Sequence, residues 1–433
     1  METKLKQIAD KAKSNPQERF TSLIHLINDE MLITSFYELK AKKAAGVDRV
    51  TKAMYQEHLE ENIADLLRRM KANQYKPQPV KRVYIPKTGN KSKRPLGIPA
   101  LEDKLVQIAI SKILSAIYEK DFLANSYGFR PNRGCHDALR ALHEILSRKK
   151  ANFIVDADIT AFFDRVDHKW MMRCLEVRIR DTKLLRLIAR ILKAGIMEDN
   201  QYHASPEGTP QGGNLSPLLA NIYLHYALDL WFEKVVKKHL KGECYMVRYA
   251  DDFVCAFQDW KEAHKVYAAL EKRLSKFSLE ISQEKSKILE FGKYAAENRQ
   301  KVGKGKPETF DFLGFTHYCS IDHNGKFRVK RKTSRKKFRN SLQRVNEWAK
   351  RNRNVRAVAL LKSLKAKLIG YYRYYGITDN IQMVRKFYHR VRQIIHYWLN
   401  RRSQRKSYNW ENFDMLWDKM RMPTPKIYIS IFS

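Results

Sequence analysis

The clearest pattern in the chain is a pair of short apolar runs that flank two acidic residues. Residues 245–249 and 253–257 are rich in β-branched and aromatic side chains, and Asp251 and Asp252 lie between them. Runs of this composition are typical of β-strands, and the polar pair between them predicts a tight hairpin turn. A third apolar run, at 153–155, predicts another strand, which leads to Asp158.

Other stretches repeat apolar residues at the spacing of amphipathic helices. Within 101–124, Leu105, Ala109, Ile113 and Ile117 recur every four residues, which predicts a buried helix. The C-terminal part carries two further stripes of this kind. Their members are Leu360, Leu361, Leu364 and Leu368 in the first, and Val384, Phe387, Tyr388, Val391, Ile395 and Trp398 in the second.

These patterns predict an α+β fold in three parts. Residues 1–75 form a charged helical extension, and residues 76–320 combine helices with a small antiparallel sheet. Residues 321–433 form a separate α-helical domain with one apolar face and one very basic face, and we expect its boundary near 320–325.

The net charge of the chain narrows the choice of partner. Its 84 Lys and Arg residues against 46 Asp and Glu residues give +38, far more than solubility requires. Such a charge indicates a polyanionic partner, with nucleic acid as the leading candidate. A structural RNA-binding protein would share the charge but would not need the carboxylates. The densest part is 326–353, and the positions we expect to bind nucleic acid there are Lys330, Arg331, Lys332, Arg335, Lys336 and Lys337.

The cysteines and the hydropathy pattern indicate the compartment. The five cysteines are widely spaced and include no CxxC pair, which argues against both a disulfide framework and a zinc site. No apolar run approaches 18 residues, so the sequence predicts neither a signal peptide nor a membrane span. We therefore expect a cytoplasmic protein.

The acidic residues at the strand ends suggest metal chemistry. Two adjacent carboxylates at a turn repel each other, so a purely structural turn does not need both Asp251 and Asp252. Hard cations such as Mg²⁺ do need carboxylate oxygens, and Asp158 at the end of another strand would complete a two-cation site. That site predicts nucleotidyl transfer. The alternative is a solvated turn without a catalytic role.

Two basic segments precede these strands. Residues 76–99 predict a hairpin lined by cations, among them Lys87 and Arg94, which would hold a triphosphate through charge-assisted hydrogen bonds. The alternative is a solvated basic loop. In the following loop, Arg130 and Arg133 are candidates for contact with a template backbone, although loop arginines are usually solvated.

Several motifs, taken together, resemble one family. In chain order they read IPKTGNKSKRPLGIP, YGFRPNRGCHDAL, DADITAFFDRVDH, TPQGGNLSPLLANIYLH, RYADDFVCAF, SLEISQEKSKI and FDFLGF. From about residue 40 onward the chain resembles group II intron reverse transcriptases. The resemblance implies a right-hand polymerase with fingers and palm, followed by a helical thumb that also serves as the maturase region and binds intron RNA.

The resemblance also implies roles for individual residues. Two Mg²⁺ ions, with Mn²⁺ as a possible substitute, would be held by Asp158, Ile159, Asp251 and Asp252. Lys285 matches a general acid for pyrophosphate, and Phe163 matches the residue that excludes a ribose 2′-hydroxyl. The deoxynucleotide site further includes Lys87, Arg94, Gln211 and Gly212, and the primer grip comprises Phe312, Leu313 and Gly314. Asp164 and Asp167 are expected to be structural, as helix caps.

The implied partners are an RNA template, a DNA or RNA primer, deoxynucleoside triphosphates and group II intron RNA, with the oligomeric state left open. No cysteine follows Cys319, so we expect no Cys-containing HNH endonuclease domain. Three alternatives remain: a domesticated or CRISPR-associated enzyme of the same type in repair or defence, and a splicing cofactor that has lost catalysis. Phe163 disfavours an RNA-dependent RNA polymerase.

Overall fold

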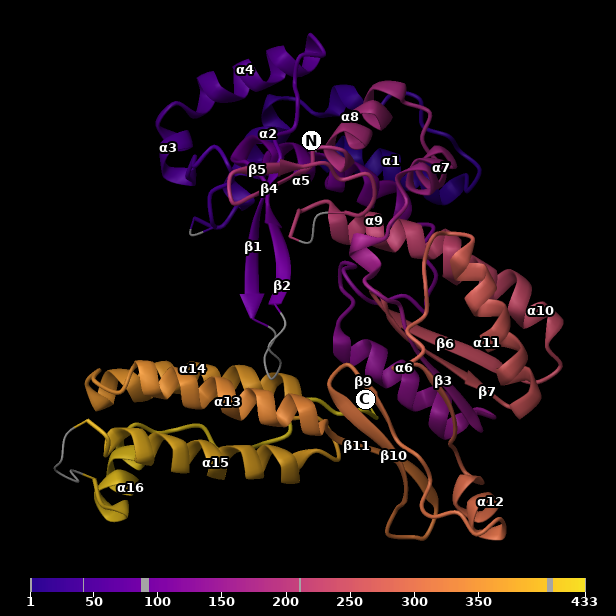
Figure 1. Cartoon of the computed structure of the whole chain (residues 1–433), viewed down its shortest axis with the longest axis vertical. Helices are drawn as coiled ribbons and strands as arrows, with labels where there is room; N and C mark the ends of the chain where they lie inside the picture. Colours follow the sequence, from indigo (N-terminus) through magenta and orange to yellow (C-terminus); the bar gives the residue numbers. More distant parts are fainter. Residues whose placement is uncertain (1, 42, 87–92, 210–211, 403–407, 433) are drawn as a thin grey trace.

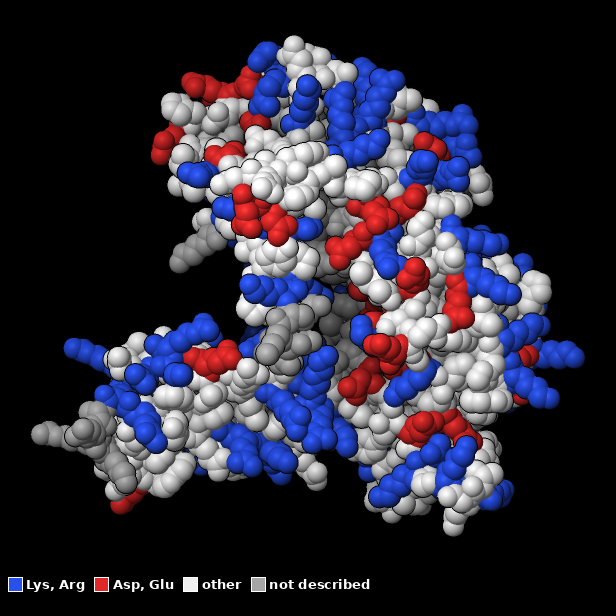
Figure 2. Space-filling view, in the orientation of Figure 1, with Lys and Arg blue, Asp and Glu red and all other residues white. Residues whose placement is uncertain are grey.

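The computed structural model describes residues 2–41, 43–86, 93–209, 212–402 and 408–432. The chain forms an arc of three parts: an N-terminal part at the top, a sheet with its helices at the right, and long helices at the lower left (Figure 1). The surface is hollowed between the N-terminal part and the long helices (Figure 2). The α+β fold that the sequence predicts is confirmed.

The central sheet, which we call the palm, has the strand order β6-β7-β3-β8, and all its neighbours are antiparallel. Its strands are β3 (Phe153–Asp158), β6 (Cys244–Tyr249), β7 (Asp252–Phe257) and β8 (Lys287–Glu290). Alternate residues of β3 and β7 enter two different hydrophobic cores, Val155 and Phe253 on one face and Ile154 and Val254 on the other. Because both faces are covered, the middle of β7 and the start of β3 are continuously apolar in sequence.

The N-terminal part, the fingers, packs on the first of these cores. Phe20 and Leu23 share that core with Leu105 and Ile113, so residues 1–75 are not a separate unit. Its sheet has the order β2-β1-β4-β5, in which β1 and β4 are parallel. Its elements are α1 (Glu2–Ser14), α2 (Asp29–Glu38), α3 (Lys52–Glu57), α4 (Leu59–Lys71), β1 (Val80–Pro86), β2 (Lys93–Ile98), α5 (Leu101–Tyr118), α7 (His168–Glu176), α8 (Thr182–Leu192), β4 (Ile196–Glu198) and β5 (Gln201–His203).

The helices that flank the palm complete its two faces. Helix α6 (Cys135–Arg148) contacts β6, and helix α11 (Trp260–Ser275) contacts β3 and β7. Helix α9 (Ser216–Leu224) continues through two π-helical turns, His225–Asp229 and Phe232–Val236, into α10 (Lys237–His239). Asp167 accepts a hydrogen bond from the Trp170 backbone N–H at the start of α7, which confirms its predicted role as a cap.

The predicted boundary at 320–325 falls inside a β-hairpin, and the region that follows begins with a strand. Strand β10 (Phe315–Ile321) pairs along its whole length with β11 (Phe327–Thr333), and β9 (Phe310–Phe312) pairs with β10. The first helix starts only at Arg335, after the cap residue Ser334. The helices, which we call the thumb, are α13 (Arg335–Arg351), α14 (Ala357–Tyr375), α15 (Ile381–Leu399) and α16 (Trp410–Lys419), while α12 (Ala295–Lys301) precedes the hairpin.

The thumb is also not separate in its packing. Leu361 and Val391 belong to the same core as Leu139 of α6 and Val254 of β7. The predicted stripe of α14 is buried, because Leu360, Leu361, Leu364 and Leu368 are at most 2% exposed. In the part of the chain that the structure describes, no helix is long and apolar enough to cross a membrane.

The buried stripe allows a stability prediction. Leu361 is fully buried, so Leu361→Ala is expected to lower the free energy of unfolding by about 2–5 kcal/mol through lost burial and a residual cavity. Val358 lies in the same helix but is 46% exposed, and Val358→Ala serves as the matched control. Chemical denaturation of both variants checks the prediction, and equal stability of the two would contradict it.

Candidate active site

Four carboxylates meet at one end of the palm sheet. The register of β3 and β7 places Asp158 directly opposite Asp252, and a two-residue turn, Ala250 and Asp251, joins β6 to β7. Asp156 precedes Asp158 by two residues and therefore lies on the same face of β3. The structure thus brings together the three predicted aspartates and one that was not predicted.

The electrostatics of this cluster favour a bound cation. The Asp252 side chain is exposed at the strand end, yet the surrounding palm displaces much of the bulk water, and this desolvation is the main reason its pKa rises to about 7. The charges of Asp156, Asp251 and Asp158 raise it further. Desolvation also raises the pKa of Asp251, and it raises that of Asp156 to about 6. Desolvated neighbouring carboxylates with raised pKa values are typical of functional sites, and a bound cation would stabilise their charged form.

The donor atoms fit Mg²⁺, which prefers hard carboxylate oxygens. Among the described residues, however, no three Asp, Glu, His or Cys side chains converge closely enough to hold a metal ion. Asp158 instead faces Lys285, whose Nζ lies 2.7 Å from its Oδ2. Both side chains are well exposed, and exposed ion pairs contribute little to stability. A cation could therefore displace this ammonium group at small cost.

Lys285 reaches the site because its turn is fastened to β3. The backbone N–H of Ser282 donates to the Asp158 carbonyl, and the Asp158 backbone N–H donates to Ser286 Oγ at 3.0 Å. The turn before strand β8 therefore carries Lys285 to the acidic cluster.

Phe163 lines a hollow of about 280 Å³, and none of the four clustered aspartates is among the described residues that line it. The hollow lies between β2, at Pro95 to Gly97, and the loop at Gly208 and Thr209. Its neighbour Phe162 is only 2% exposed and packs on Tyr223 in the core. Of the two phenylalanines, only Phe163 borders the hollow.

The loop that contains Gly212 closely approaches the hairpin formed by β1 and β2. Gly212 has a φ of +116°, and a Cβ at this position would come within 2.7 Å of the Gly97 carbonyl oxygen of β2. Only glycine fits such a conformation and contact without strain. Two predicted site residues, Lys87 and Gln211, lie outside the described residues.

Arg94 extends from β2 toward the acidic cluster. It is exposed, and its positive charge acts to lower the pKa of Asp251. Arg94 and Asp251 are thus close enough to interact, which places a guanidinium group beside the carboxylates.

The turn between β9 and β10 touches the same site. Leu313 and Gly314 have positive φ values of 48° and 82°, which makes a tight turn. The Leu313 backbone N–H hydrogen-bonds the Asp252 carboxylate, and the Tyr374 hydroxyl of α14 donates to the Leu313 carbonyl at 2.8 Å. The predicted primer-grip segment therefore links the palm to the thumb.

Two predicted nucleic-acid contacts are wrong in this structure. The Arg130 side chain is 4% exposed and donates to Glu119 and to backbone carbonyls, so it fastens its loop to the end of α5. Arg331 is fully buried between His143 and Asp379. Arg133 is half-buried and donates to the Ala124 carbonyl, yet part of it reaches solvent.

The other basic positions of the run are accessible. Lys332, Arg335, Lys336 and Lys337 are exposed, and Lys330 is half-buried. Figure 2 shows basic side chains gathered where β11 meets α13. The Lys337 stem also lies against Gly314 of the β9–β10 turn, which brings this surface next to the acidic site.

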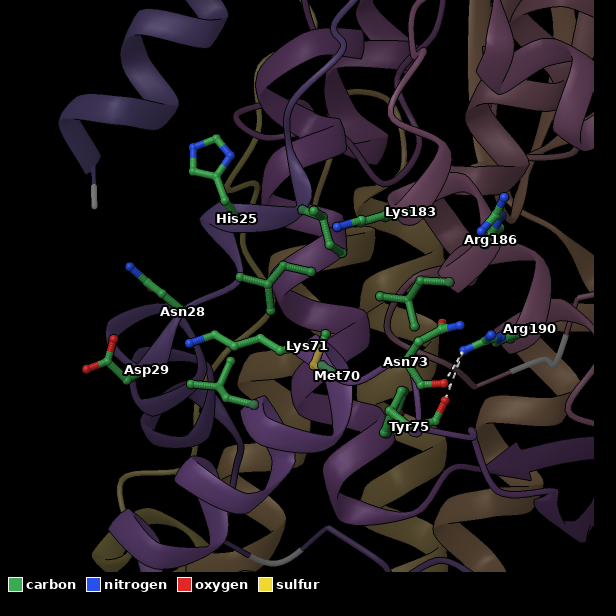
Figure 3. Close-up of a pocket in the computed structure, with 14 residues that line it drawn as sticks. His25, Asn28, Asp29, Met70, Lys71, Asn73, Tyr75, Lys183, Arg186 and Arg190 are labelled. Atoms are coloured by element: carbon green, nitrogen blue, oxygen red, sulfur yellow. Dashed lines mark hydrogen bonds between the residues drawn. The ribbon is translucent and has the colours of Figure 1, made fainter.

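A hollow of about 760 Å³ in the fingers contains none of the predicted residues. It lies between α4, α8 and the segment 24–29, and Figure 3 shows Lys71, Lys183 and Arg186 around it. Arg190 donates there to the carbonyls of Asn73 and Tyr75. This hollow is larger than the one at Phe163, so cavity volume does not identify the candidate active site.

Comparisons with known proteins agree with this geometry. The family model described as reverse transcriptase (RNA-dependent DNA polymerase) matches residues 85–317, from the fingers hairpin to β10. Group II intron-encoded protein LtrA of Lactococcus lactis subsp. cremoris is 36% identical over 286 residues, which are 66% of this chain and 45% of that protein. Protein YkfC of Escherichia coli (strain K12) is 36% identical over 227 residues, 51% of this chain and 59% of that protein.

A more distant relative is nuclear intron maturase 1, mitochondrial, of Arabidopsis thaliana, which is 31% identical over 100 residues, 22% of this chain and 13% of that protein. The chain spans about half the length of the first two relatives. The matched region holds the carboxylate cluster, the hollow at Phe163 and Lys285. The chain therefore belongs to the reverse transcriptase (RNA-dependent DNA polymerase) family, and its relatives include group II intron-encoded proteins, as its motifs predict.

Proposed function

We propose that the chain is an RNA-directed DNA polymerase of group II intron type. The observation that carries the proposal is the register of β3 and β7, which opposes Asp158 to Asp252 next to the turn residue Asp251. A cluster of carboxylates with raised pKa values in a strongly basic protein fits a two-cation site that acts on nucleic acid.

In this mechanism Asp158, Asp251 and Asp252, with the Ile159 carbonyl, would hold two Mg²⁺ ions. Bound Mg²⁺ supplies positive charge that activates the primer 3′-hydroxyl and stabilises the leaving pyrophosphate. Arg94 and Lys87 bind the triphosphate, and Phe163 excludes the ribose 2′-hydroxyl. Lys285 then leaves Asp158 and donates a proton from Nζ to the pyrophosphate. The chain contributes mainly positioning, as in phosphoryl transfer generally.

The thumb and the primer grip position the nucleic acids. Phe312, Leu313 and Gly314 hold the primer end beside Asp252, and the exposed cations at the start of α13 follow the template–primer backbone. We further propose that residues 321–433 bind group II intron RNA and assist splicing. The Arabidopsis relative carries the name intron maturase, which supports this second role.

A splicing cofactor without catalysis is the second candidate. The basic surface at β11 and α13 would serve it equally well. The carboxylate cluster favours catalysis, because a protein that only binds RNA has no use for four carboxylates at one sheet end.

Primer extension tests the proposal. The purified protein is expected to extend a DNA primer on an RNA template with Mg²⁺ and deoxynucleotides, and EDTA is expected to stop the reaction. A protein that binds template–primer but adds no nucleotide would support the splicing cofactor instead.

Sugar selection is a separate prediction. Phe163→Val is expected to raise incorporation of ribonucleotides relative to deoxynucleotides by roughly ten- to a hundredfold, because the smaller side chain leaves room for a 2′-hydroxyl. The measurement is the ratio of kcat/KM values for the two sugars. Phe162→Val is the comparison variant, since that ring lies in the core. Unchanged discrimination in Phe163→Val, or a larger change in Phe162→Val, would show that another residue excludes the 2′-hydroxyl.

A further inference from the structure

Arg248, three residues before Asp251, lies at the centre of a buried network. Its guanidinium group is fully buried in β6. Nε and Nη2 donate to the two carboxylate oxygens of Asp229, at 2.7 and 2.5 Å. Nη2 also donates to Ser126 Oγ at 2.7 Å, and Nη1 donates to Asn221 Oδ1 at 3.1 Å.

The remaining donor reaches the turn that carries the catalytic aspartates. Nη1 donates to the Ala250 carbonyl oxygen at 2.9 Å. With this bond all five N–H groups of the guanidinium have an acceptor. Ala250 has a φ of +58°, a left-handed conformation that costs free energy for any residue except glycine. Arg248 therefore stabilises a strained residue that immediately precedes Asp251.

A second segment holds the turn from the other side. A Cβ on Gly128 would overlap the Ala250 backbone nitrogen, so the loop backbone packs directly on the turn. Asn221 Nδ2 donates to the Gly128 carbonyl at 2.7 Å while its Oδ1 accepts from Arg248. The backbones of Asn125, Tyr127 and Arg248 also exchange hydrogen bonds. Asn221 thus connects the guanidinium to the loop that confines Ala250.

Asp229, the acidic partner of Arg248, lies in a π-helical turn. Asp229 is fully buried and ends the π-helical turn His225–Asp229 that follows α9. Single π-turns are often found at functional sites, since they change the direction in which a helix presents its side chains. A buried Arg–Asp pair adds little net stability compared with apolar residues, so stability alone does not explain its presence.

We propose that Arg248, held by Asp229 and Asn221, is a positioning residue that fixes the Ala250–Asp251 turn and so places Asp251 for metal binding. This inference rests on the proposed polymerase function. None of the hydrogen bonds of the Arg248 guanidinium goes to a carboxylate of the acidic cluster. Its contact with the turn is the bond to the Ala250 carbonyl, and its positive charge also acts to lower the pKa of Asp251.

The first test compares two buried arginines. Arg248→Lys keeps a positive charge for Asp229 but cannot also reach Ala250, Asn221 and Ser126. We expect kcat for primer extension to fall roughly 10- to 100-fold. We also expect the Mg²⁺ concentration for half-maximal activity to rise while the KM for template–primer stays unchanged. Arg178, buried in an ion pair with Asp121 at 2.6 Å, supplies the control Arg178→Lys, which is expected to lower stability without shifting the Mg²⁺ dependence.

The second readout does not depend on activity. Amide hydrogen exchange in the strands and turn at 247–253 is expected to speed up in Arg248→Lys and to stay at the wild-type rate in Arg178→Lys. If Arg248→Lys fails to fold, Asn221→Ala decides, because it keeps the ion pair and removes only the contacts to Nη1 and Gly128.

The outcomes separate the two proposals. An active wild-type protein with unchanged Mg²⁺ dependence and unchanged exchange in these variants would overturn the positioning role. A wild-type protein that does not extend primers would overturn the proposed function, and the exchange comparison would still decide whether Arg248 holds the turn.

Discussion

Asp251→Ala is expected to lower the rate of primer extension roughly a thousandfold or more, because it removes a proposed ligand of the catalytic cations. The carboxylate lies in the turn between β6 and β7, where the charges of Asp158 and Arg94 both reach it. Because binding of template–primer depends on the basic surfaces, its dissociation constant should change little. Single-turnover extension and filter binding measure the two quantities.

The same measurement applies to Asp158 and Asp252, which face each other across strands β3 and β7. Asp158→Ala and Asp252→Ala are expected to abolish extension as well, because each removes a ligand of the proposed cations. Glu284, an exposed acid beside Lys285, provides the matched control Glu284→Ala, which should retain activity. Near wild-type extension by any of the three aspartate variants would show that its carboxylate is not a metal ligand.

The acidic site could be predicted largely from the sequence because short apolar runs lie on either side of Asp251 and Asp252. The pattern at residues 245–257 predicts two strands and a turn, and the structure has β6, β7 and a two-residue turn there. The turn itself lies one residue earlier than the Asp251-Asp252 pair suggests, since Asp252 already pairs with Tyr249. Sequence cannot give the register of β3 against β7, because that pairing joins residues about a hundred positions apart.

Asp156 was missed although a signal for it exists. Residues two apart on a strand share a face, so Asp156 and Asp158 must point the same way. Arg248 carried no such signal. Its partners Ser126, Asn221 and Asp229 come from three other segments, and only the fold brings them together.

Two of the predicted nucleic-acid contacts are wrong because a charged residue in the sequence is not always exposed in the fold. Arg130 pairs with Glu119, only eleven residues away, while Arg331 is enclosed by residues from α6 and from the turn at Asp379. The boundary at 320–325 failed for a related reason. The composition from Lys326 onward predicts helices, but alternate residues of β11 such as Val329 and Arg331 are buried, and Arg331 contacts His143 of α6.

This distinction sharpens the test of the thumb surface. Replacing Lys332, Arg335, Lys336 and Lys337 with Gln removes four exposed charges and leaves the buried Arg331 in place. Each lost phosphate contact should flatten the log–log dependence of affinity on salt by roughly 0.9 on a duplex or 0.7 on a single strand. The matched control replaces Lys261, Lys265, Lys272 and Lys276, which are exposed on or next to α11 at the other side of the palm (Figure 1).

The losses of affinity for template–primer duplex and for intron RNA then decide which role the thumb surface has. Both template–primer duplex and cognate intron RNA should bind the thumb variant more weakly, and the α11 control should lose less affinity for either. A polymerase thumb needs cations only to follow a duplex, so a greater loss for intron RNA would indicate contacts beyond polymerisation. Equal losses would make this surface an ordinary duplex-binding thumb. Because Lys337 packs against Gly314 of the primer grip, part of the loss on the duplex should also appear as a higher KM for template–primer during extension.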